Sequence, residues 1–380
     1  MKNAARMKSL LEYCEARVDA ITADIEALAA LESPSTDKAA VDRCGAELIA
    51  RLRAIGAGVG VLPRSERGDH ITASWDGDEP GVLLLGHFDT VWAAGTLASM
   101  PVRRDGDRLF GPGVFDMKAG IAIALAAVRA LLDTKQRRPA IHMLLTTDEE
   151  IGSATSREEI VAAARRSRAV LVLEPALPGG ALKTARKGCG KYELLVEGVA
   201  AHAGLDPGKG VSAIHELADH IRAIEALADP RSGVTLNVGV VEGGTRANVV
   251  AAHARAVVDA RALTSADANR VDAALRRLQP RRAGVRLTLR GGFERPPMER
   301  SSDVDRLFNL AREVASQLGR SLDEGTAGGG SDGNFTAAAG VPTLDGLGAV
   351  GDGAHAAHEH VTISDLPWRA ALVAGLIARL

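Results

Sequence analysis

The segment VLLLGHFD (82–89) is a short, unbroken apolar run that ends in a histidine and an aspartate. Two further runs have the same form, since IHMLLTTDEE (141–150) and AVLVLEP (169–175) also lead into acidic side chains. Runs of this kind are typical of strands buried on both faces of a parallel sheet. A helical stretch, KAGIAIALAAVRALLDT (118–134), lies between the first two runs. This alternation predicts an α/β fold with a central, mostly parallel sheet flanked by helices.

The middle of the chain has a different pattern. Strand-like segments at 191–202, 234–244, 253–263 and 285–292 combine with helical segments at 210–227 and 265–279 in the order β-α-β-β-α-β. This order is the ferredoxin-like split pattern. We therefore predict an inserted α+β domain over residues 187–293, with residues 1–186 and 294–380 forming the first domain.

The flanking segments complete the first domain. Residues 1–33 read as one amphipathic helix, 301–318 as a helix, 340–350 as a strand and 364–380 as a final helix. A glycine-rich loop, GTAGGGSDGNF (325–335), lies between the last two of these helices; no GK[ST] follows it, so it is not a phosphate-binding loop.

Bulk composition excludes several classes of function. The 380 residues carry a net charge of −2, which suggests no polyelectrolyte partner such as nucleic acid. No apolar stretch reaches the length of a membrane span, and the N-terminus does not read as a signal peptide. Three widely spaced cysteines, without a CxxC pair, fit a reducing compartment, so we expect a cytoplasmic protein.

Polar residues at the strand ends are candidates for a metal site. In open α/β sheets, ligands bind beyond the carboxyl ends of the strands, where His87, Glu149, Glu150 and Glu174 are expected. His87, Glu150 and Glu174 form, together with Asp116 and His355, a set that can hold a pair of divalent ions, zinc first, with cobalt or manganese possible. Of the two neighbouring glutamates, one can bind metal and the other can act as general base.

Each of these residues also has a simpler interpretation. Asp116 precedes a helix and could be its N-cap, and for Asp148 the cap at the next helix is favoured. Glu149 and Glu150 could be first-turn acids that complement the helix dipole. Glu174 could be an exposed loop residue. Any single one of the C-terminal histidines, His355, His358 and His360, could lie on the surface. The metal interpretation is favoured because potential ligands occur together at the ends of consecutive predicted strands.

Seven short motifs occur in a familiar order: LLLGHFDTV, GPGVFDMKAG, TTDEEIGS, LEPA, AAHAG, GGSDGN and GAHAAHEHV. They resemble the ordered motifs of a co-catalytic zinc exopeptidase and aminoacylase family, which includes glutamate carboxypeptidases, acetylornithine deacetylase and succinyl-diaminopimelate desuccinylase. The motifs extend from about residue 80 to residue 361. Each motif is short, and their combined order makes the resemblance specific.

The resemblance implies a role for each residue of the metal site. His87 and Glu174 bind one zinc ion, Glu150 and His355 bind the other, and Asp116 bridges the two. Asp89 orients His87, and Glu149 is the general base. His358 is a rival of His355 for the last position; His355 is preferred because it lies four residues before Glu359.

The resemblance also implies that residues 187–293 form a lid and dimerisation domain. In the homodimer, His202 reaches a neighbouring active site and polarises the scissile carbonyl. Asn248 assists binding, Arg261 receives a substrate carboxylate through its planar guanidinium, and Gly330 and Ser331 line the substrate's terminal end. A surface charge at a strand edge is the simpler interpretation of Arg261.

The implied reaction is hydrolysis of an amide bond by zinc-activated water. The motifs GHFDTVW, TTDEEIGS and GDGAHAAHEHV most resemble those of glutamate carboxypeptidases. These enzymes release a C-terminal amino acid, often glutamate, from peptides or from acyl and folate-type conjugates. The alternative is an N-acyl amino acid deacylase of the acetylornithine or succinyl-diaminopimelate type.

Overall fold

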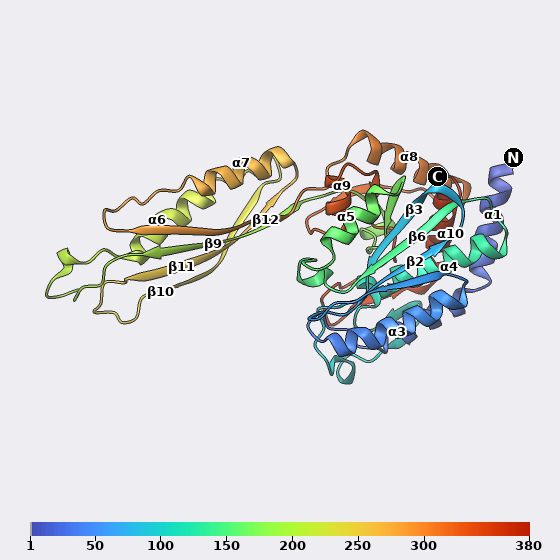
Figure 1. Ribbon diagram of the computed structural model, residues 1–380, viewed down its shortest axis with the longest axis horizontal. Helices are drawn as coiled ribbons and strands as arrows, with labels where there is room; N and C mark the ends of the chain where they lie inside the picture. Colours follow the sequence, from blue (N-terminus) through green and yellow to red (C-terminus); the bar gives the residue numbers. More distant parts are fainter. Residues whose placement is uncertain (1) are drawn as a thin grey trace. The chain divides into compact units, whose positions relative to one another are not determined.

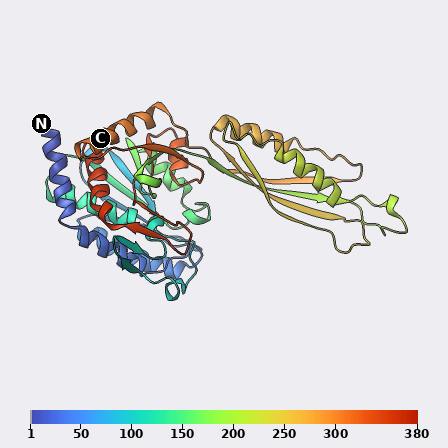
Figure 2. The ribbon, with the colours of Figure 1, turned by 180° about the vertical axis from the view of Figure 1, so that it is seen from behind.

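A computed structural model describes residues 2–380, which divide into two compact units. Unit 1 consists of residues up to Thr184, Arg300–Ala327 and Ser331–Leu380, and unit 2 of Ala185–Glu299 with Gly328–Gly330. Figures 1 and 2 show the strands and helices of each unit from opposite sides. Among the helices of the described residues, none combines the length and apolar character needed to cross a membrane.

Unit 1 is built on a six-stranded sheet with the order β1-β2-β6-β3-β7-β14. The strands are β1 (Gly58–Leu62), β2 (His70–Trp75), β3 (Asp78–His87), β6 (Pro139–Thr146), β7 (Ala169–Val172) and β14 (Thr343–Leu344). Strands β6, β3, β7 and β14 pair in parallel, whereas β2 pairs antiparallel with both of its neighbours. The predicted α/β fold with a mostly parallel central sheet is therefore confirmed.

Helices cover both faces of this sheet. The helices are α1 (Lys2–Glu15), α2 (Val18–Ala29), α3 (Lys38–Ala54), α4 (Ala119–Asp133), α8 (Ser302–Gln317) and α10 (Leu366–Ile377) on one face, and α5 (Arg157–Arg165) and α9 (Gly333–Ala338) on the other. Val82 and Leu84 of β3 point to the first face, and Leu83 and Leu85 point to the second. Because successive side chains of a strand alternate, an unbroken apolar run serves two cores at once.

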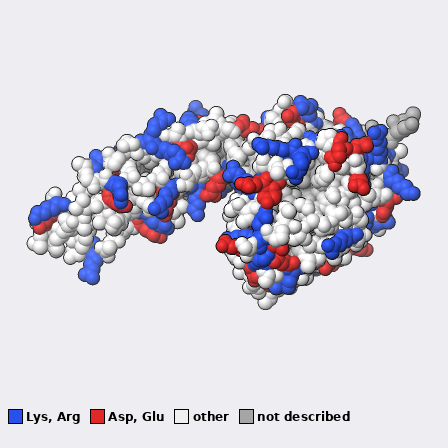
Figure 3. Space-filling model, in the orientation of Figure 1, with Lys and Arg blue, Asp and Glu red and all other residues white. Residues whose placement is uncertain are grey.

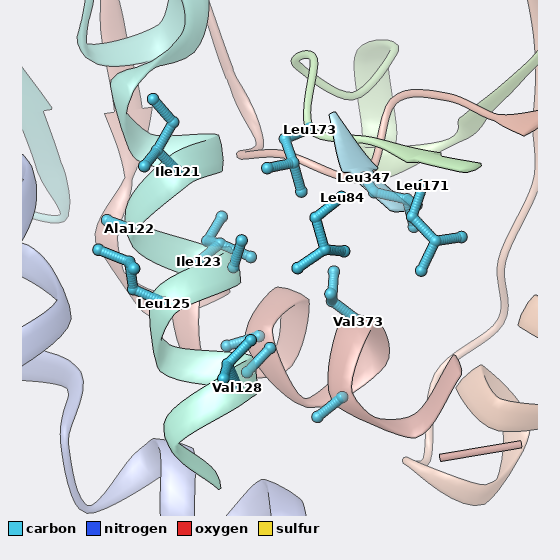
Figure 4. Close-up of a cluster of buried hydrophobic side chains, with 14 of the residues drawn as sticks. Leu84, Ile121, Ala122, Ile123, Leu125, Val128, Leu171, Leu173, Leu347 and Val373 are labelled. Atoms are coloured by element: carbon cyan, nitrogen blue, oxygen red, sulfur yellow. The ribbon is translucent and has the colours of Figure 1, made fainter. Parts of the chain in front are cut away.

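The larger core lies between the sheet and α4. In Figure 4, Leu84 of β3 faces Ile123 of α4 and Val373 of α10, with Leu171 and Leu173 beside it. Helix α4 is buried on almost all sides because α1, α2 and α10 pack against it from outside. Packing of these helices around α4 explains why its sequence is apolar at every position except Arg129 and Asp133.

Several peripheral elements differ from the prediction. The N-terminal segment forms two helices, α1 and α2, separated at Ala16 and Arg17, and the strand predicted over 340–350 is confined to Thr343–Leu344. Two smaller sheets were not predicted. They contain β15 (Gly351–Asp352), β16 (His360–Thr362), β5 (Arg108–Phe110) and β4 (Arg103–Asp105) in that order, and β13 (Glu324–Ala327) with β8 (Leu182–Arg186).

Unit 2 contains a four-stranded antiparallel sheet with the order β10-β11-β9-β12. Its elements are β9 (Gly188–Glu197), α6 (Ala213–Glu225), β10 (Thr235–Gly243), β11 (His253–Ala262), α7 (Ser265–Arg276) and β12 (Arg286–Arg295). This is the predicted β-α-β-β-α-β order, with the strand arrangement of a ferredoxin-like fold. Alternate residues of β9 and β11 are buried in one apolar cluster with α6 and α7.

The other face of the unit 2 sheet carries charged side chains in pairs. Arg255 forms ion pairs with Glu193 and Glu242, and Arg286 pairs with Glu197 across neighbouring strands. In the view of Figure 3, basic and acidic atoms are interspersed on both units, as the balanced charge of the sequence leads one to expect.

Candidate metal centre

Neighbouring strand ends bring the first candidate ligands together. His87 ends β3 and is in register with Thr146, the last residue of the parallel strand β6. Glu149 and Glu150 follow β6 in a short 3₁₀ turn, Glu149–Ile151, and Glu174 follows β7 on the other side of β3. Three adjacent parallel strands therefore deliver their polar ends to one edge of the sheet.

Asp116 lies between two histidines at this edge. Its Oδ1 is 3.3 Å from Nε2 of His87, and its Oδ2 is 3.3 Å from Nε2 of His355. Glu174 lies on the His87 side, with Oε1 3.4 Å from the same Nε2. Glu150 lies on the His355 side, with Oε2 3.1 Å from Nε2 of that residue. The five predicted ligands thus form two half-sites that share Asp116.

The donor set fits divalent cations. The donor atoms of His87, Asp116 and Glu150 lie within 4.8 Å of one another. The Nε2 atom of His87 is buried, and its contacts with the Asp116 and Glu174 carboxylates are not aligned as hydrogen bonds, which is costly for a polar atom unless another species completes it. Imidazole nitrogen together with carboxylate oxygen is the combination that zinc, cobalt and manganese accept.

In the absence of a cation, protons on the two histidines offset part of the negative charge of the carboxylates around them. Burial lowers the pKa of His87, but the surrounding carboxylates, Asp116 first, outweigh this effect and raise the pKa well above its usual value. Hydrogen bonds to Asp116 and Glu150 raise the pKa of His355 to about 10. Burial raises the pKa of Asp116, but the two histidines reverse this effect and hold the pKa below its usual range. Burial raises the pKa of Glu150.

Asp89 connects the histidine to the loop of the glutamates. Nδ1 of His87, the ring nitrogen that faces away from Asp116, lies 3.1 Å from the backbone carbonyl of Asp89 and 3.3 Å from its carboxylate Oδ1. The backbone N–H groups of Glu149 and Glu150 donate to the two carboxylate oxygens of Asp89, each at 3.3 Å. The hydroxyl of Ser35 donates to Oδ2 at 2.7 Å. Asp89 is fully buried, so its partners fix both the ring of His87 and the position of the glutamate turn.

The cap interpretation is wrong for Asp116 and holds only for the position, not for the side chain, of Asp148. Asp116 has extended rather than helical dihedral angles, φ −114° and ψ 94°, inside the irregular turn Val114–Lys118, and Lys118 takes the N-cap position of α4. Asp148, favoured as the cap of the next helix, does occupy the N-cap position of the 3₁₀ turn Glu149–Ile151, but its side chain makes no cap hydrogen bond there, and Ser156 takes the N-cap position of α5. The Asp148 carboxylate instead accepts the N–H of Thr155 at 2.6 Å and the hydroxyl of Ser156 at 2.6 Å, because it is buried beneath this loop.

The C-terminal loop distinguishes His355 from its rival. His355 adopts a positive φ of 61°, and its ring contacts Asp116 and Glu150. His358 lies 4.0 Å from Asp352 and is mostly exposed. Sequence reasoning used Glu359 only as a spacing marker, yet this residue is fully buried against the loop of Asp116. Burial raises the pKa of Glu359, and four N–H donors oppose that rise. No sequence pattern indicates this contact, because the partners are more than 240 residues apart.

The remaining candidates divide between the two units. In unit 2, His202 is exposed and its Nδ1 accepts the N–H groups of Gly204 and Leu205, while Asn248 is exposed on a turn. Arg261 already contacts a carboxylate, because its Nε and Nη2 donate to Asp259 at 2.8 Å each.

The glycine-rich loop is held from inside the protein. The carbonyl of Gly330 accepts a hydrogen bond from Arg186 at 3.2 Å. Ser331 is fully buried, and its hydroxyl donates to Asp345 at 2.7 Å. In this structure the Ser331 hydroxyl therefore serves the loop's own architecture.

Comparison with known proteins places this geometry in a family. Residues 83–379 match the model of peptidase family M20/M25/M40. The chain is 31% identical over 375 residues to carboxypeptidase G2 of Pseudomonas sp. (strain RS-16), covering 94% of this chain and 88% of that protein. It is 30% identical over 360 residues to succinyl-diaminopimelate desuccinylase of Xanthomonas euvesicatoria pv. vesicatoria (strain 85-10), covering 89% of this chain and 93% of that one.

Solved structures agree on the fold. Aminopeptidase PepT from Bacillus cereus superimposes with a TM-score of 0.78 at 24% identity, covering 95% of this chain and 98% of that one. The M20 family metallo-carboxypeptidase Sso-CP2 from Sulfolobus solfataricus gives a TM-score of 0.73 at 16% identity, covering 94% and 98%. The match to the family model, the relatives at 30% identity or more and the clustered ligands lead to one conclusion: this chain is a hydrolase of peptidase family M20/M25/M40.

Proposed function

We propose that this hydrolase releases a C-terminal amino acid, glutamate foremost, from peptides or from N-acyl and folate-type conjugates, with two Zn²⁺ ions per chain. The observation that carries the proposal is the position of Asp116, whose two oxygens each face a different imidazole. A single cation needs no such shared carboxylate, whereas a pair of cations about 3.5–4 Å apart does. The 31% identity to carboxypeptidase G2 over 94% of the chain supports the carboxypeptidase reading.

The two half-sites support a division of the proposed ligands between two ions. His87 and Glu174 would hold one ion, Glu150 and His355 the other, and Asp116 both; Co²⁺ or Mn²⁺ suits the same donors. When bound, the ions supply Lewis-acid activation of a water molecule and of the substrate carbonyl.

Glu149 has the proton-transfer role in this proposal. It begins the 3₁₀ turn after β6 and precedes the proposed ligand Glu150, so its carboxylate belongs to the turn that borders the cluster. The carboxylate takes a proton from the attacking water as the new carbon–oxygen bond forms. It then gives that proton to the amine nitrogen as the carbon–nitrogen bond breaks, so the proton balance closes within one turnover. Asp89 keeps Glu149 in place by accepting its backbone N–H.

Unit 2 serves as the lid and dimerisation domain in this proposal. Several of its apolar side chains are exposed, led by Leu205 at 78% and Val241 at 54%, and a second copy of the chain is the partner we propose for them. His202 would polarise the scissile carbonyl, and Asn248 would assist it. Arg261 would receive the substrate carboxylate by exchanging its contact with Asp259 for the ligand.

A second candidate function is deacylation of N-acyl amino acids. Its support is the 30% identity to a succinyl-diaminopimelate desuccinylase over 89% of the chain. The two functions share the metal chemistry and differ in which side of the amide bond carries the recognised group.

Three free cysteines, Cys14, Cys44 and Cys189, are the support for the cytoplasmic location that we propose for either enzyme.

A panel of substrates separates the two functions. Pteroyl-glutamate, an N-acyl glutamate, acetylornithine and succinyl-diaminopimelate are each incubated with chelator-stripped enzyme and with the same enzyme after Zn²⁺ is restored. We expect release of glutamate from the first two, only after Zn²⁺ is added. Release of ornithine or of diaminopimelate without cleavage of the glutamate conjugates would reassign the enzyme to the deacylases. Hydrolysis that is unaffected by stripping and restoration would reject the metal site.

A further inference from the structure

Glu359 is a fully buried carboxylate surrounded by N–H donors. Its Oε1 accepts the backbone N–H groups of Phe115 at 2.9 Å and Asp116 at 3.0 Å. Its Oε2 accepts the backbone N–H of Gly113 at 2.9 Å and the indole N–H of Trp92 at 2.8 Å. Every one of these contacts needs an acceptor, so the site suits a carboxylate and not a neutral amide.

These donors come from loops that carry candidate metal ligands. Phe115 and Asp116 belong to the irregular turn before α4, which places the shared carboxylate, and Gly113 immediately precedes that turn. Trp92 lies on the loop that continues from His87 and Asp89. Glu359 itself stands four residues after His355 in the loop between β15 and β16. One buried side chain therefore ties together three loops that come from distant parts of the sequence.

The loop of Glu359 is also closely packed on its other side. A side chain at Gly353 would place its Cβ 2.9 Å from both N and Cα of Glu359, so the backbone approaches closely here. The backbone N–H of Gly111 points to the carbonyl of Glu359 at 3.4 Å. Glu359 has little room to shift, and its position sets that of the turn that it binds.

We propose that Glu359 is a positioning residue that sets the separation between Asp116 and His355, and with it the affinity and geometry of the metal pair. The inference rests on the proposed function, because it takes Asp116 and His355 to be ligands. The Glu359 carboxylate accepts the backbone N–H of Asp116. This hydrogen bond fixes the backbone that carries the Asp116 side chain, the ligand shared by the two half-sites. Residues that orient metal ligands in this way affect metal affinity without touching the metal.

The test is a cobalt titration of the full chain after metal is removed with a chelator. Binding of Co²⁺ is followed by visible absorption and by competition with a chelator of known affinity. The variants are Glu359→Gln, Trp92→Phe and the double variant. Glu216→Gln is the matched control, because Glu216 is equally buried and also accepts a backbone N–H, that of Arg281, but lies in unit 2.

We expect Glu359→Gln to weaken Co²⁺ binding about 10- to 100-fold and to change the absorption spectrum, since the amide must turn an NH₂ group toward two N–H donors. Trp92→Phe removes a single donor and should weaken binding less. Both changes affect the same hydrogen bond, which the indole of Trp92 donates to Glu359. The loss of Co²⁺ affinity in the double variant should therefore be smaller than the losses of the two single variants combined. Glu216→Gln should bind Co²⁺ as the unchanged protein does.

Each result has one meaning. The inference is overturned if Glu359→Gln is folded, as verified by circular dichroism, and has the same Co²⁺ affinity and absorption spectrum as the unchanged protein. The proposed function still stands in that case. If Glu359→Gln does not fold, Trp92→Phe decides, and unchanged Co²⁺ binding in that variant also overturns the inference. An unchanged protein that takes up no Co²⁺ rejects the proposed function itself.

Discussion

The Asp89 carboxylate accepts the backbone N–H of Glu149 at 3.3 Å, although the two residues lie on loops that follow different strands. The same carboxylate lies 3.3 Å from Nδ1 of His87. The candidate general base and a candidate metal ligand therefore both contact one buried residue, which meets His87 through its backbone carbonyl at 3.1 Å as well as through its carboxylate. A change at Asp89 should disturb both functions, whereas a change of the Glu149 side chain should disturb only one.

Replacement of Asp89 by asparagine tests this coupling. The variant keeps the size of the side chain but loses its charge and one acceptor. We expect metal affinity to fall about 10- to 100-fold, and kcat to fall with it even at saturating Zn²⁺. Ser35→Ala is the control, because it removes one donor to Asp89 and leaves the charge in place. Equal metal affinity and kcat in Asp89→Asn and the unchanged enzyme would contradict the coupling.

Two glycines inside helices should respond oppositely to alanine. A Cβ on Gly120 of α4 would lie 2.0 Å from the carbonyl oxygen of Leu173, the residue before Glu174, and neither backbone can move freely. We expect Gly120→Ala to lower the free energy of unfolding by about 1–3 kcal/mol. A Cβ on Gly45 of α3 would lie 3.4 Å from the Phe88 ring, which is ordinary contact. Gly45→Ala should raise stability by up to about 1 kcal/mol.

Urea unfolding of both variants measures this difference. Gly120→Ala should also weaken metal binding, because the displaced Leu173 carries Glu174 with it. Equal stability of the two variants would mean that the approach of α4 to β7 is looser than the structure shows.

Metal uptake should release protons. In the metal-free protein the pKa of His87 is well above its usual value and that of His355 is about 10, so both rings carry protons at neutral pH. Metal binding requires neutral imidazole, so about two protons per chain should leave at pH 7. Calorimetry in buffers of different ionisation enthalpy counts them. His355→Ala should release fewer protons, and a heat of binding that is independent of the buffer would contradict the shifted pKa values.

The same shifts predict how the metal-free protein responds to pH. The folded-state pKa of His355 lies above its ordinary value of 6.5, so protonation stabilises the fold. This stabilisation is complete below pH 6.5 and is lost as pH rises to about 10. The melting temperature of stripped protein should therefore fall across this window, and less so in His355→Ala. A melting temperature that rises with pH in the stripped protein would contradict this sign.

The sequence predicts what local patterns determine. Apolar runs such as 82–89 and the helix 118–134 lie where expected, because burial on both sheet faces leaves a continuous signal. The β-α-β-β-α-β order of unit 2 follows from alternation in the same way. Strands β1 and β2 were missed; β1 is an edge strand whose face is only partly buried, so its apolar pattern is weak.

Contacts between distant loops lie beyond such patterns. The ligand set was assembled from strand ends and family motifs, and the structure brings these residues together. Asp148 precedes a helical turn as predicted, but its carboxylate binds Thr155 and Ser156 of the following loop, a contact that has the same local sequence as a side-chain cap. The anion of Glu359 meets its donors only through the tertiary fold, so no spacing rule could have found it.

The most direct measurement is the activity and metal content of Glu149→Gln. The substitution keeps the shape of the side chain and its backbone N–H to Asp89 but removes the proton acceptor. The proposal predicts that kcat for glutamate release falls by about 10²–10⁴-fold, while elemental analysis still finds two Zn²⁺ per chain. Turnover equal to that of the unchanged enzyme, at full metal occupancy, would remove Glu149 from the mechanism and contradict the proposal.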